Sequence, residues 1–479
     1  MTFRRSLAVF TLWPLLCAAT SLVQCTGDRS AAPGTTAAPL PSAPPGDPVR
    51  ILISGSMLGR LEPCGCASGQ LGGLARRMQH IGERRSYDLL LEGGDLVAGA
   101  DELDRQKFFT AVQVLTGMAH RYDALGVGPK DLALPLDEWA AYLADTPAVA
   151  CDLVSSREDW PVRPFVEKDV RGQKVRTTAM TLSLPPALQA DDAPVRLLPP
   201  AEAWQRALVD ADPATLRIVL LHTSDTKARE LVPTLQPAPD LVVCCDEDRV
   251  EPAAHAEPVG ATRMVFAGIR GRVLLEVELA RTTDGPHVVT ELVPLAGSKT
   301  VPGGGGDPDV KQLLLAHRDQ VKQDRILEQL ARQQPTPNGA AYVGSEMCKT
   351  CHPSAWEAFA ASKHFHAWET LQKAEADPKR YGWPVTHYPD CVSCHVVGYR
   401  EQTGFVSFDE TPHLAGVGCE RCHGPGSDHM QNPTQNRLGI HGGVQASVLC
   451  VQCHDYEQSP EFVYDQRWAV IRHGREPKK

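Results

Sequence analysis

The sequence predicts a two-part protein, with an α/β domain over residues 49–298 and a mostly helical region over residues 340–479. In the first part, short apolar runs alternate with stretches of helical spacing, which is typical of buried strands connected by helices. In the second part, one motif of cysteine and histidine recurs four times, with little chain between its copies. The 479 residues, 42% of them hydrophobic, suffice for two or three domains.

The composition excludes two classes of protein. The net charge is −10, so a basic footprint for nucleic acid or anionic lipid is missing, and we expect no nucleic-acid partner. The mean hydropathy is −0.23. One long apolar run, at the extreme N-terminus, is too little for a polytopic membrane protein.

Residues 1–25 have the pattern of an export signal, because Arg4 and Arg5 precede a long apolar stretch. The end of that stretch, LVQC, resembles a bacterial lipoprotein box with Cys25 as the lipidated residue. Ordinary signal cleavage and an uncleaved anchor are the alternatives. Residues 26–48 are rich in Ala and Pro and predict a tether. We therefore expect the protein in the periplasm or on the outer face of a membrane, where Cys25 would tether it.

Apolar runs and turn signals locate the strands of the α/β domain. Strand-like runs fall at residues 49–53, 88–91, 216–221, 241–244 and 263–266. Two further strands, 272–279 and 287–294, are expected to form a hairpin around Asp284 and Gly285.

Helical spacing predicts helices over residues 72–85 and 103–120 of the α/β domain and a third over residues 307–334. The third follows four consecutive glycines and ends before Pro335. We interpret it as a connector that docks the two parts of the chain, with a solvated spacer helix as the alternative.

The C-terminal region contains four copies of the pentapeptide CxxCH. Each copy has two cysteines and a histidine: Cys348, Cys351 and His352; Cys391, Cys394 and His395; Cys419, Cys422 and His423; Cys450, Cys453 and His454. Two thiols three residues apart fall on one side of a helical turn and can both add to the vinyl groups of a haem, and the next residue offers its imidazole to the iron. Structural zinc and disulfides also use paired cysteines, but neither explains a histidine after every pair. We therefore predict four covalently attached haem c groups.

The four haems would lie close together, because only about 27 residues of chain are available for each. So short a segment cannot build an ordinary core around each haem, and the macrocycles would themselves fill the interior. Neighbouring redox centres conduct electrons, which predicts a carrier with redox proteins of the periplasm or membrane as partners.

The second axial ligand decides whether each haem only carries electrons or also binds a substrate. Only Met347 and Met430 lie in this region, so histidine pairs are expected in general. The preferred candidates for the second ligand are His364, His366, His429 and His473. For His387, His413 and His441, a solvated side chain in a loop is as good an interpretation as a haem ligand. The sequence does not decide between His366 and His387 as the fourth of these second ligands.

The segments SKHFHAWETL, CVSCHVVGY, CERCHGPGSDH and CVQCHD resemble the cytochrome c-552/4 family of tetrahaem cytochromes. The resemblance covers residues 340–479. It implies a mostly helical domain, mainly bis-histidine iron and, in some members, one five-coordinate haem. It also implies electron transfer linked to the oxidation of hydroxylamine and related compounds.

In the N-terminal part, the segments ILISGSMLGR, LEGGD, YDALGVGPKDL and VLLHTSD resemble the calcineurin-like metallophosphoesterase domain of the 5'-nucleotidase family. The resemblance implies an α/β sandwich whose enzymes use two divalent metals. At its metal-binding positions this chain has Ser56 and Leu58, then Pro129 and Lys130, and later Cys245, Asp246, Glu247 and Asp248. Only Asp95 and His222 match, and they are too few for two metals. We predict a degenerate domain without phosphoesterase activity.

Five cysteines of the mature chain lie outside the haem motifs: Cys64, Cys66, Cys151, Cys244 and Cys245. One or two disulfides and a buried thiol would be ordinary for an exported protein. The alternative is a thiolate-rich site that binds a further metal at Cys64 and Cys66, with His222 or Asp95 as co-ligand.

The sequence thus favours an exported tetrahaem electron carrier over two alternatives. One is a haem enzyme that acts on a small nitrogen or sulfur compound at one open iron. The other is a periplasmic nucleotidase or phosphoesterase, which the missing metal ligands disfavour.

Overall fold

A computed structural model describes residues 47–65, 69–84, 86–118, 120–245, 248–249, 251–297, 304–377, 383–439, 444–456 and 458–473. The expected export signal, Cys25 and most of the tether lie outside these residues, as do Cys66 and His441. All described residues belong to one compact unit, 44–479. Within them, the search for a helix long and apolar enough to cross a membrane finds none.

Two six-stranded sheets form the N-terminal domain. The first has the strand order β14-β13-β1-β2-β3-β4. Its strands are β1 (Val49–Ser54), β2 (Leu89–Glu92), β3 (Ala124–Gly126), β4 (Ala148–Val149), β13 (Val273–Thr282) and β14 (Gly285–Pro294). β1 to β4 are parallel, and the hairpin of β13 and β14 adds to β1 in antiparallel orientation. The predicted hairpin forms, and its turn is Thr283 and Asp284, because Gly285 already pairs with Thr282.

The second sheet has the order β11-β12-β10-β9-β7-β6. Its strands are β6 (Val166–Val170), β7 (Gln173–Met180), β9 (Leu216–Leu221), β10 (Leu241–Cys244), β11 (Glu257–Val259) and β12 (Thr262–Phe266). The central strands β7, β9, β10 and β12 are parallel. A short pair, β5 (Leu153–Ser155) and β8 (Val195–Leu197), stands apart from both sheets.

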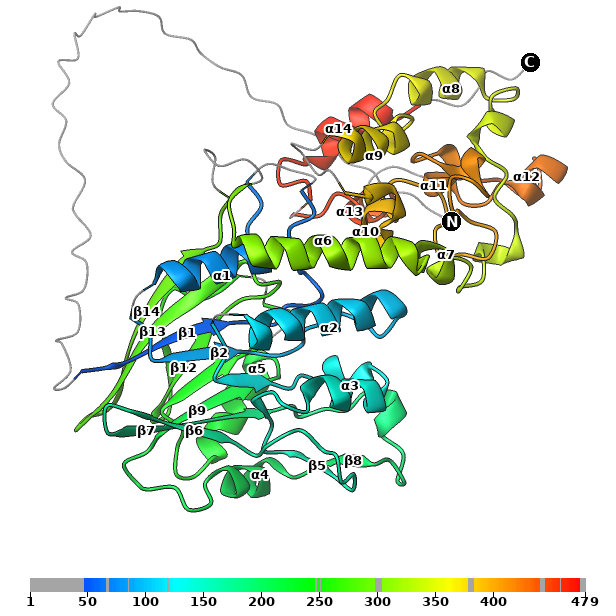
Figure 1. The fold of residues 1–479 in the computed structure, drawn as a ribbon. Coiled ribbons are helices and arrows are strands. Elements are labelled where there is room, and N and C mark those ends of the chain that lie inside the picture. The colour runs from blue at the N-terminus through cyan, green and yellow to red at the C-terminus, as the bar shows by residue number, and fades with distance from the viewer. Residues whose placement is uncertain are drawn as a thin grey trace, which may run out of the picture. The chain divides into compact units, whose positions relative to one another are not determined.

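The two sheets pack face to face with helices on their outer sides (Figure 1). Along β9, Ile218 and Leu220 belong to the central core cluster, whereas Val219 and Leu221 belong to a second cluster with the outer helix α4 (Pro200–Ala207). This alternation explains the unbroken apolar run of the strand, because both faces are buried. The α/β sandwich predicted from the sequence is therefore confirmed.

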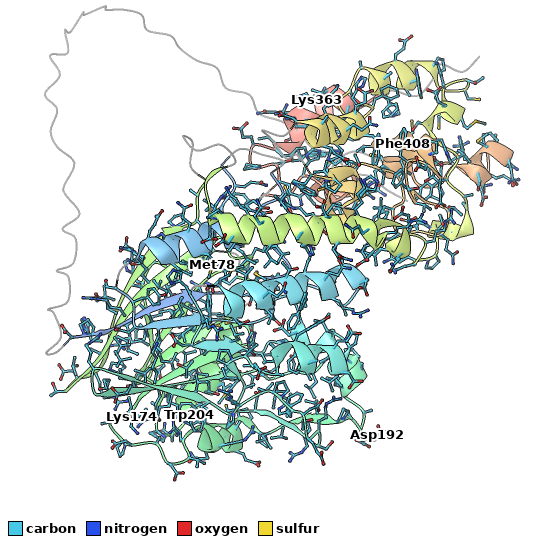
Figure 2. The ribbon with its side chains drawn as sticks, viewed as in Figure 1. Met78, Lys174, Asp192, Trp204, Lys363 and Phe408 are labelled. Carbon is cyan, nitrogen blue, oxygen red and sulfur yellow. The ribbon has the colours of Figure 1, made fainter. Side chains whose placement is uncertain are left out.

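The helices α1 (Leu74–Glu83) and α2 (Glu102–Gly117) cover the first sheet, and α3 (Leu136–Leu143) and α5 (Asp225–Leu231) complete the domain. Figure 2 labels Met78 of α1 and Trp204 of α4, which are 1% and 2% exposed and belong to the two different core clusters. Asp101 caps α2 by accepting a hydrogen bond from the backbone N–H of Asp104.

The single helix expected over residues 307–334 is two helices in the structure. α6 (Pro308–Gln323) begins at the capping residue Asp307, and α7 (Ile326–Leu330) follows a break at Arg325, whose φ is 54°. A left-handed residue cannot continue a right-handed helix, so the chain turns there. α6 runs beside α1 and α2 (Figure 1), and its buried residues include Val310, Leu314 and Val321.

The regular elements described in the C-terminal region are helices, as expected, but they are short and loops separate them. Its helices are α8 (Pro353–Ala360), α9 (Ala367–Ala376), α10 (Pro389–Val392), α11 (Cys419–His423), α12 (Ser427–Gln431), α13 (Val444–Val451) and α14 (Tyr464–Ile471). Its apolar cluster is small and includes Trp368, Val392 and Phe405. Phe408, labelled in Figure 2, stacks on Trp368 with ring centroids 5.4 Å apart. The cysteines and histidines of the four motifs lie around this cluster rather than inside it.

Candidate functional site

Each CxxCH motif forms a helical turn. The backbone N–H of His352 donates to the carbonyl of Cys348 at 3.0 Å, and that of His454 donates to Cys450 at 2.9 Å. The third motif is the whole of α11, which ends at Gly424 with φ of 83°, a conformation that favours glycine. The turn places both cysteines of a motif on one side and the histidine beside them.

Three of the four motif histidines face a second histidine that is distant in sequence. The ring centroids of His352 and His429 are 6.0 Å apart, with 25° between the ring planes. His454 faces His364 at 6.0 Å. An iron held between two imidazole nitrogens at ~2 Å each puts the ring centroids about 6 Å apart, so these pairs leave the space of one iron.

The third pair is His423 with His473, whose ring centroids are 5.7 Å apart. His473 is the last histidine of the chain and follows α14. Three separate histidine pairs at this spacing fit the bis-histidine haems that the sequence predicts, and His364, His429 and His473 were all among the expected ligands.

Hydrogen bonds at the far ring nitrogen orient the candidate ligands. Nδ1 of His429 lies 2.9 Å from the carbonyl oxygen of Asn436, and Nδ1 of His395 lies 2.7 Å from that of Ala367. A carbonyl only accepts, so Nδ1 carries the proton in both rings and Nε2 keeps its lone pair for a metal. The oxygen of Ser459 lies 3.0 Å from Nδ1 of His454 and can orient that ring likewise.

The motifs touch one another in two pairs. The side chains of Cys348 and Cys419 are in hydrogen-bond contact, and so are those of Cys394 and Cys453. Arg421, in the third motif, also reaches Cys453 of the fourth, with its nitrogen 3.7 Å from the sulfur. The first site is therefore adjacent to the third, and the fourth is adjacent to both the second and the third.

The second motif differs, because no ring contact joins His395 to another histidine in the described part of the chain. Of the two candidates for its partner, His366 lies at the surface, with Nδ1 3.1 Å from Glu369. Nδ1 of His387 lies 3.0 Å from the hydroxyl of Thr386. The assignment of either residue as a haem ligand stays a prediction.

His395 lines a cavity together with Cys391 and Cys394. Apolar and aromatic side chains from both parts of the chain complete its wall, among them Leu314, Leu371, Trp383 and Val385. The donor set and the apolar wall fit a haem attached at the second motif.

A histidine in this wall is not available as a ligand. Nδ1 of His317, on α6, lies 3.0 Å from the hydroxyl of Thr110, and its Nε2 lies 3.1 Å from that of Tyr388. Burial and the nearby charges of Lys107 and Arg318 lower the pKa of His317 to about 3, so the ring is neutral. Both ring nitrogens are engaged, and the residue joins α2 to the C-terminal region.

In the N-terminal domain, the matched residues Asp95 and His222 do come together. Nδ1 of His222 lies 3.3 Å from Oδ2 of Asp95, and both side chains are buried. Burial disfavours the charged ring, but the carboxylates of Asp95 and Asp131 outweigh it and raise the pKa of His222. The carboxylate of Asp131 is already engaged, because it accepts hydrogen bonds from the backbone N–H groups of Asp95, Leu96 and Gly128.

Backbone groups occupy the place of the missing ligands. The N–H of Lys130 donates to Oδ1 of Asp95 at 2.9 Å, and the N–H of Leu58 donates to the Asp95 carbonyl at 2.8 Å. The hydroxyl of Ser56 is buried and has no hydrogen-bond partner among the described residues. In that part of the chain, no group of three or more His, Cys, Asp or Glu is arranged to hold a metal ion.

The cysteines of the N-terminal domain are separate thiols. Cys244 ends β10, Cys245 follows it and Cys151 follows β4, so all three lie at the carboxyl ends of strands, as the resemblance implies. No disulfide joins any two described cysteines. Burial raises the pKa of Cys151 to about 12 and raises that of Cys245 as well, so both stay protonated. Cys64 lies elsewhere, in the wall of the His395 cavity.

Two features of the site could not be predicted from any pattern in the sequence. Glu420, inside the third motif, is 3% exposed and accepts hydrogen bonds from the backbone N–H groups of Val343, Gly344 and Gly426. The segment Gly59–Cys64 lines the His395 cavity although it belongs to the N-terminal domain. Both depend on contacts between distant parts of the chain, which no local pattern encodes.

Comparisons with known proteins point to the same chemistry in the C-terminal region. Residues 347–424 match the family described as cytochrome c554 and c-prime. A stretch of 146 residues is 36% identical to cytochrome c-554 of Nitrosomonas europaea, which is 25% of this chain and 61% of the relative. The chain thus spans less than two thirds of the length of that relative.

Two of the solved structures that resemble the chain over more than half of its length are nucleotidases. The NAD nucleotidase of Haemophilus influenzae has a TM-score of 0.48 and 13% identity, over 76% of this chain and 74% of that one. A 5'-nucleotidase precursor from Thermus thermophilus has a TM-score of 0.45 and 18% identity, over 65% and 67%.

The four cysteine and histidine motifs, the paired imidazoles and the sequence match all fall in the same region. The C-terminal region of this chain therefore carries the motifs of a c-type cytochrome and is similar to cytochrome c-554, and it is joined to an α/β domain of two stacked sheets.

Proposed function

We propose that this protein is an exported electron carrier with four covalently attached haem c groups. The observation that carries the proposal is the set of three histidine pairs, His352 with His429, His364 with His454 and His423 with His473, at ring separations of 5.7 to 6.0 Å. Cys348, Cys351, Cys391, Cys394, Cys419, Cys422, Cys450 and Cys453 would hold the macrocycles.

Paired imidazoles support electron transfer rather than catalysis at three of the sites. An iron with histidine on both faces has no open position for a substrate. A haem bound there would therefore only accept and donate electrons. The contacts of Cys348 with Cys419 and of Cys394 with Cys453 bring neighbouring motifs together. Haems attached to these motifs would be close enough to pass electrons in sequence.

The partners would be redox proteins outside the cytoplasm. Covalent haem attachment is completed after export, and the N-terminal 25 residues have the pattern of an export signal. We propose a position in the periplasm or on the outer face of a membrane, with Cys25 as the lipid anchor.

The second candidate function is that of a haem enzyme, and His395 favours it. Its ring has no facing imidazole among the described residues, and it borders a cavity with an apolar wall. A haem at this motif would keep one open position. Such a site could bind a small nitrogen or sulfur compound and pass electrons to the three other haems.

Spectroscopy of protein made with a haem-maturation system tests both candidates. A pyridine-haemochrome assay should give four haems per chain, and EPR should show three low-spin centres and one high-spin centre. His429→Ala should convert one low-spin signal to high spin, because it removes the imidazole that faces His352. His413→Ala is the control, since His413 is exposed and forms no histidine pair in the described region.

Two results would contradict the proposal. Absence of covalently bound haem, or zinc at the motif thiols, would remove the electron-carrier function altogether. Four low-spin centres in the unmodified protein would remove the enzyme candidate and leave the carrier.

We also propose that the N-terminal domain has no phosphoesterase activity. The support is that the backbone N–H of Lys130 donates to Oδ1 of the Asp95 carboxylate, where further ligands would be needed for two metals. Manganese-supplemented assays with nucleotides and generic phosphate esters should give no turnover.

A further inference from the structure

The His395 cavity is completed by the N-terminal domain. The segment Gly59–Cys64, which follows β1 of the first sheet, lines the cavity together with Cys391, Cys394 and His395. The segment is held in place at both ends. The N–H of Gly59 donates to the carbonyl of Leu96 at 2.9 Å, and the N–H of Leu74 donates to that of Leu61 at 2.8 Å.

The same segment also lines a second cavity. Both cavities are lined by Arg60, Glu62, Pro63, Cys64 and Gln458, so they meet at this wall. The second cavity is more polar and is also lined by Arg270, Arg272 and Tyr456. We call this second cavity the vestibule of the His395 cavity.

Three arginines and one glutamate line the vestibule. Glu62 is neutralised by Arg318 of α6, with which it forms an ion pair. Arg270 lies 4.0 Å from Asp455 and Arg272 lies 3.2 Å from Glu251, so these two have acidic neighbours.

Arg60 is different. Its side chain forms no ion pair and no hydrogen bond with any residue that the structure describes, and its attraction to Asp390 acts on a carboxylate that Lys107 already pairs with. Arg60 is half-buried where the two cavities meet. A guanidinium in such a position presents its donors to whatever enters. The charge of Arg60 also stands at the approach to the second motif, where the open haem would lie.

We propose that the vestibule and Arg60 form a binding site for a small inorganic anion on its way to the haem at His395. The N-terminal domain would thus select the charge of the ligand, whereas the cytochrome region would supply the iron. This inference rests on the proposed function, because it requires an open position at the second haem. A positive cavity with partly desolvated walls concentrates anions and leaves neutral molecules unaffected.

The test compares an anionic with a neutral haem ligand in the full-length holoprotein. Azide is titrated into the ferric protein, and carbon monoxide into the ferrous protein, each followed by the visible absorbance of the high-spin haem. Arg60→Gln should raise the dissociation constant for azide about tenfold, which corresponds to about 1.4 kcal/mol. It should leave carbon monoxide binding unchanged, since that ligand is neutral.

Two further variants make the result specific. Arg50→Gln removes the same charge from an exposed position on β1, where Arg50 pairs with Glu278, and should not change azide affinity. Arg60→Lys keeps the charge and should restore most of the affinity that Arg60→Gln loses. Added salt should weaken azide binding to the unmodified protein more than to Arg60→Gln.

The outcomes separate this inference from the function on which it rests. Equal azide affinity in the unmodified protein and Arg60→Gln, with normal carbon monoxide binding, would overturn the vestibule and leave the open haem intact. Absence of carbon monoxide binding in the unmodified protein would overturn the open haem, and the inference with it.

Discussion

Glu420 shows how one residue can connect two haem motifs. It lies between the cysteines of the third motif, yet its carboxylate accepts hydrogen bonds from the backbone N–H groups of Val343 and Gly344, which lie shortly before the first motif. It also accepts from Gly426. A carboxylate that satisfies three backbone donors fixes both segments, so the first and third haem sites keep their relative position.

Replacing Glu420 by Gln tests this function of the residue. The amide cannot accept at both ends, so at least one buried N–H loses its partner, and the free energy of unfolding should fall by about 1–3 kcal/mol. Denaturant unfolding followed by haem absorbance measures the change. Glu410→Gln is the matched control, because Glu410 is exposed and lies 3.8 to 3.9 Å from its arginine partners. An equal loss in both variants would contradict the explanation.

At the scale of elements, α6 joins the two parts of the chain through His317. The ring lies between Thr110 of α2 and Tyr388, which precedes α10. Lys107 and Arg318 disfavour its protonation, and Asp390 opposes them more weakly. The docking of α6 therefore depends on a neutral histidine.

This arrangement predicts acid sensitivity. The pKa of His317 is about 3 in the folded protein and ~6.5 in the unfolded chain, so the folded state binds fewer protons below pH 6.5. The contribution to stability is complete above pH 6.5 and is lost as the pH falls, by about 2 kcal/mol at pH 5. Denaturant unfolding at pH 7 and pH 5 should show this loss in the unmodified protein and a smaller one in His317→Gln. His255→Gln, at an exposed position, should behave as the unmodified protein does.

At the scale of the whole molecule, ion pairs join the α/β domain to the cytochrome region. Nζ of Lys107 on α2 lies 2.7 Å from Asp390, next to the second motif, and Arg400 lies 2.7 Å from Asp101. The Lys107 side chain is only 8% exposed. These contacts lie beside the cavity that Gly59–Cys64 completes, so the two parts should unfold together.

Replacing Lys107 by Met should make the unfolding of the two parts less cooperative. The variant removes the charge that partners Asp390, and we expect a loss of about 1–2 kcal/mol concentrated at the contact between the two parts. In the unmodified protein, thermal transitions followed by far-UV circular dichroism and by haem absorbance should coincide. In Lys107→Met they should separate, whereas Lys168→Met, which breaks an exposed pair within the α/β domain, should leave them together. Separate transitions in the unmodified protein would show that the contact does not couple the two parts.

The sequence by itself determined the features that are local in the chain. Apolar runs located β1, β9, β10 and the hairpin of β13 and β14 to within a few residues, because burial on both faces requires such runs. Short edge strands such as β6, with its mostly exposed residues, left no such pattern. The CxxCH motifs were equally plain, since one helical turn contains all the groups that would hold a haem.

Only the tertiary structure decided which histidines meet and which does not. His429, His364 and His473 each lie opposite a motif histidine far away in the sequence, and the break at Arg325 sets the path of the chain into this region. Among the described residues no ring faces His395, and this and the contribution of Gly59–Cys64 to its cavity follow from the same packing. Spacing along the chain specifies a helical turn, but a contact between distant segments depends on how every intervening element packs.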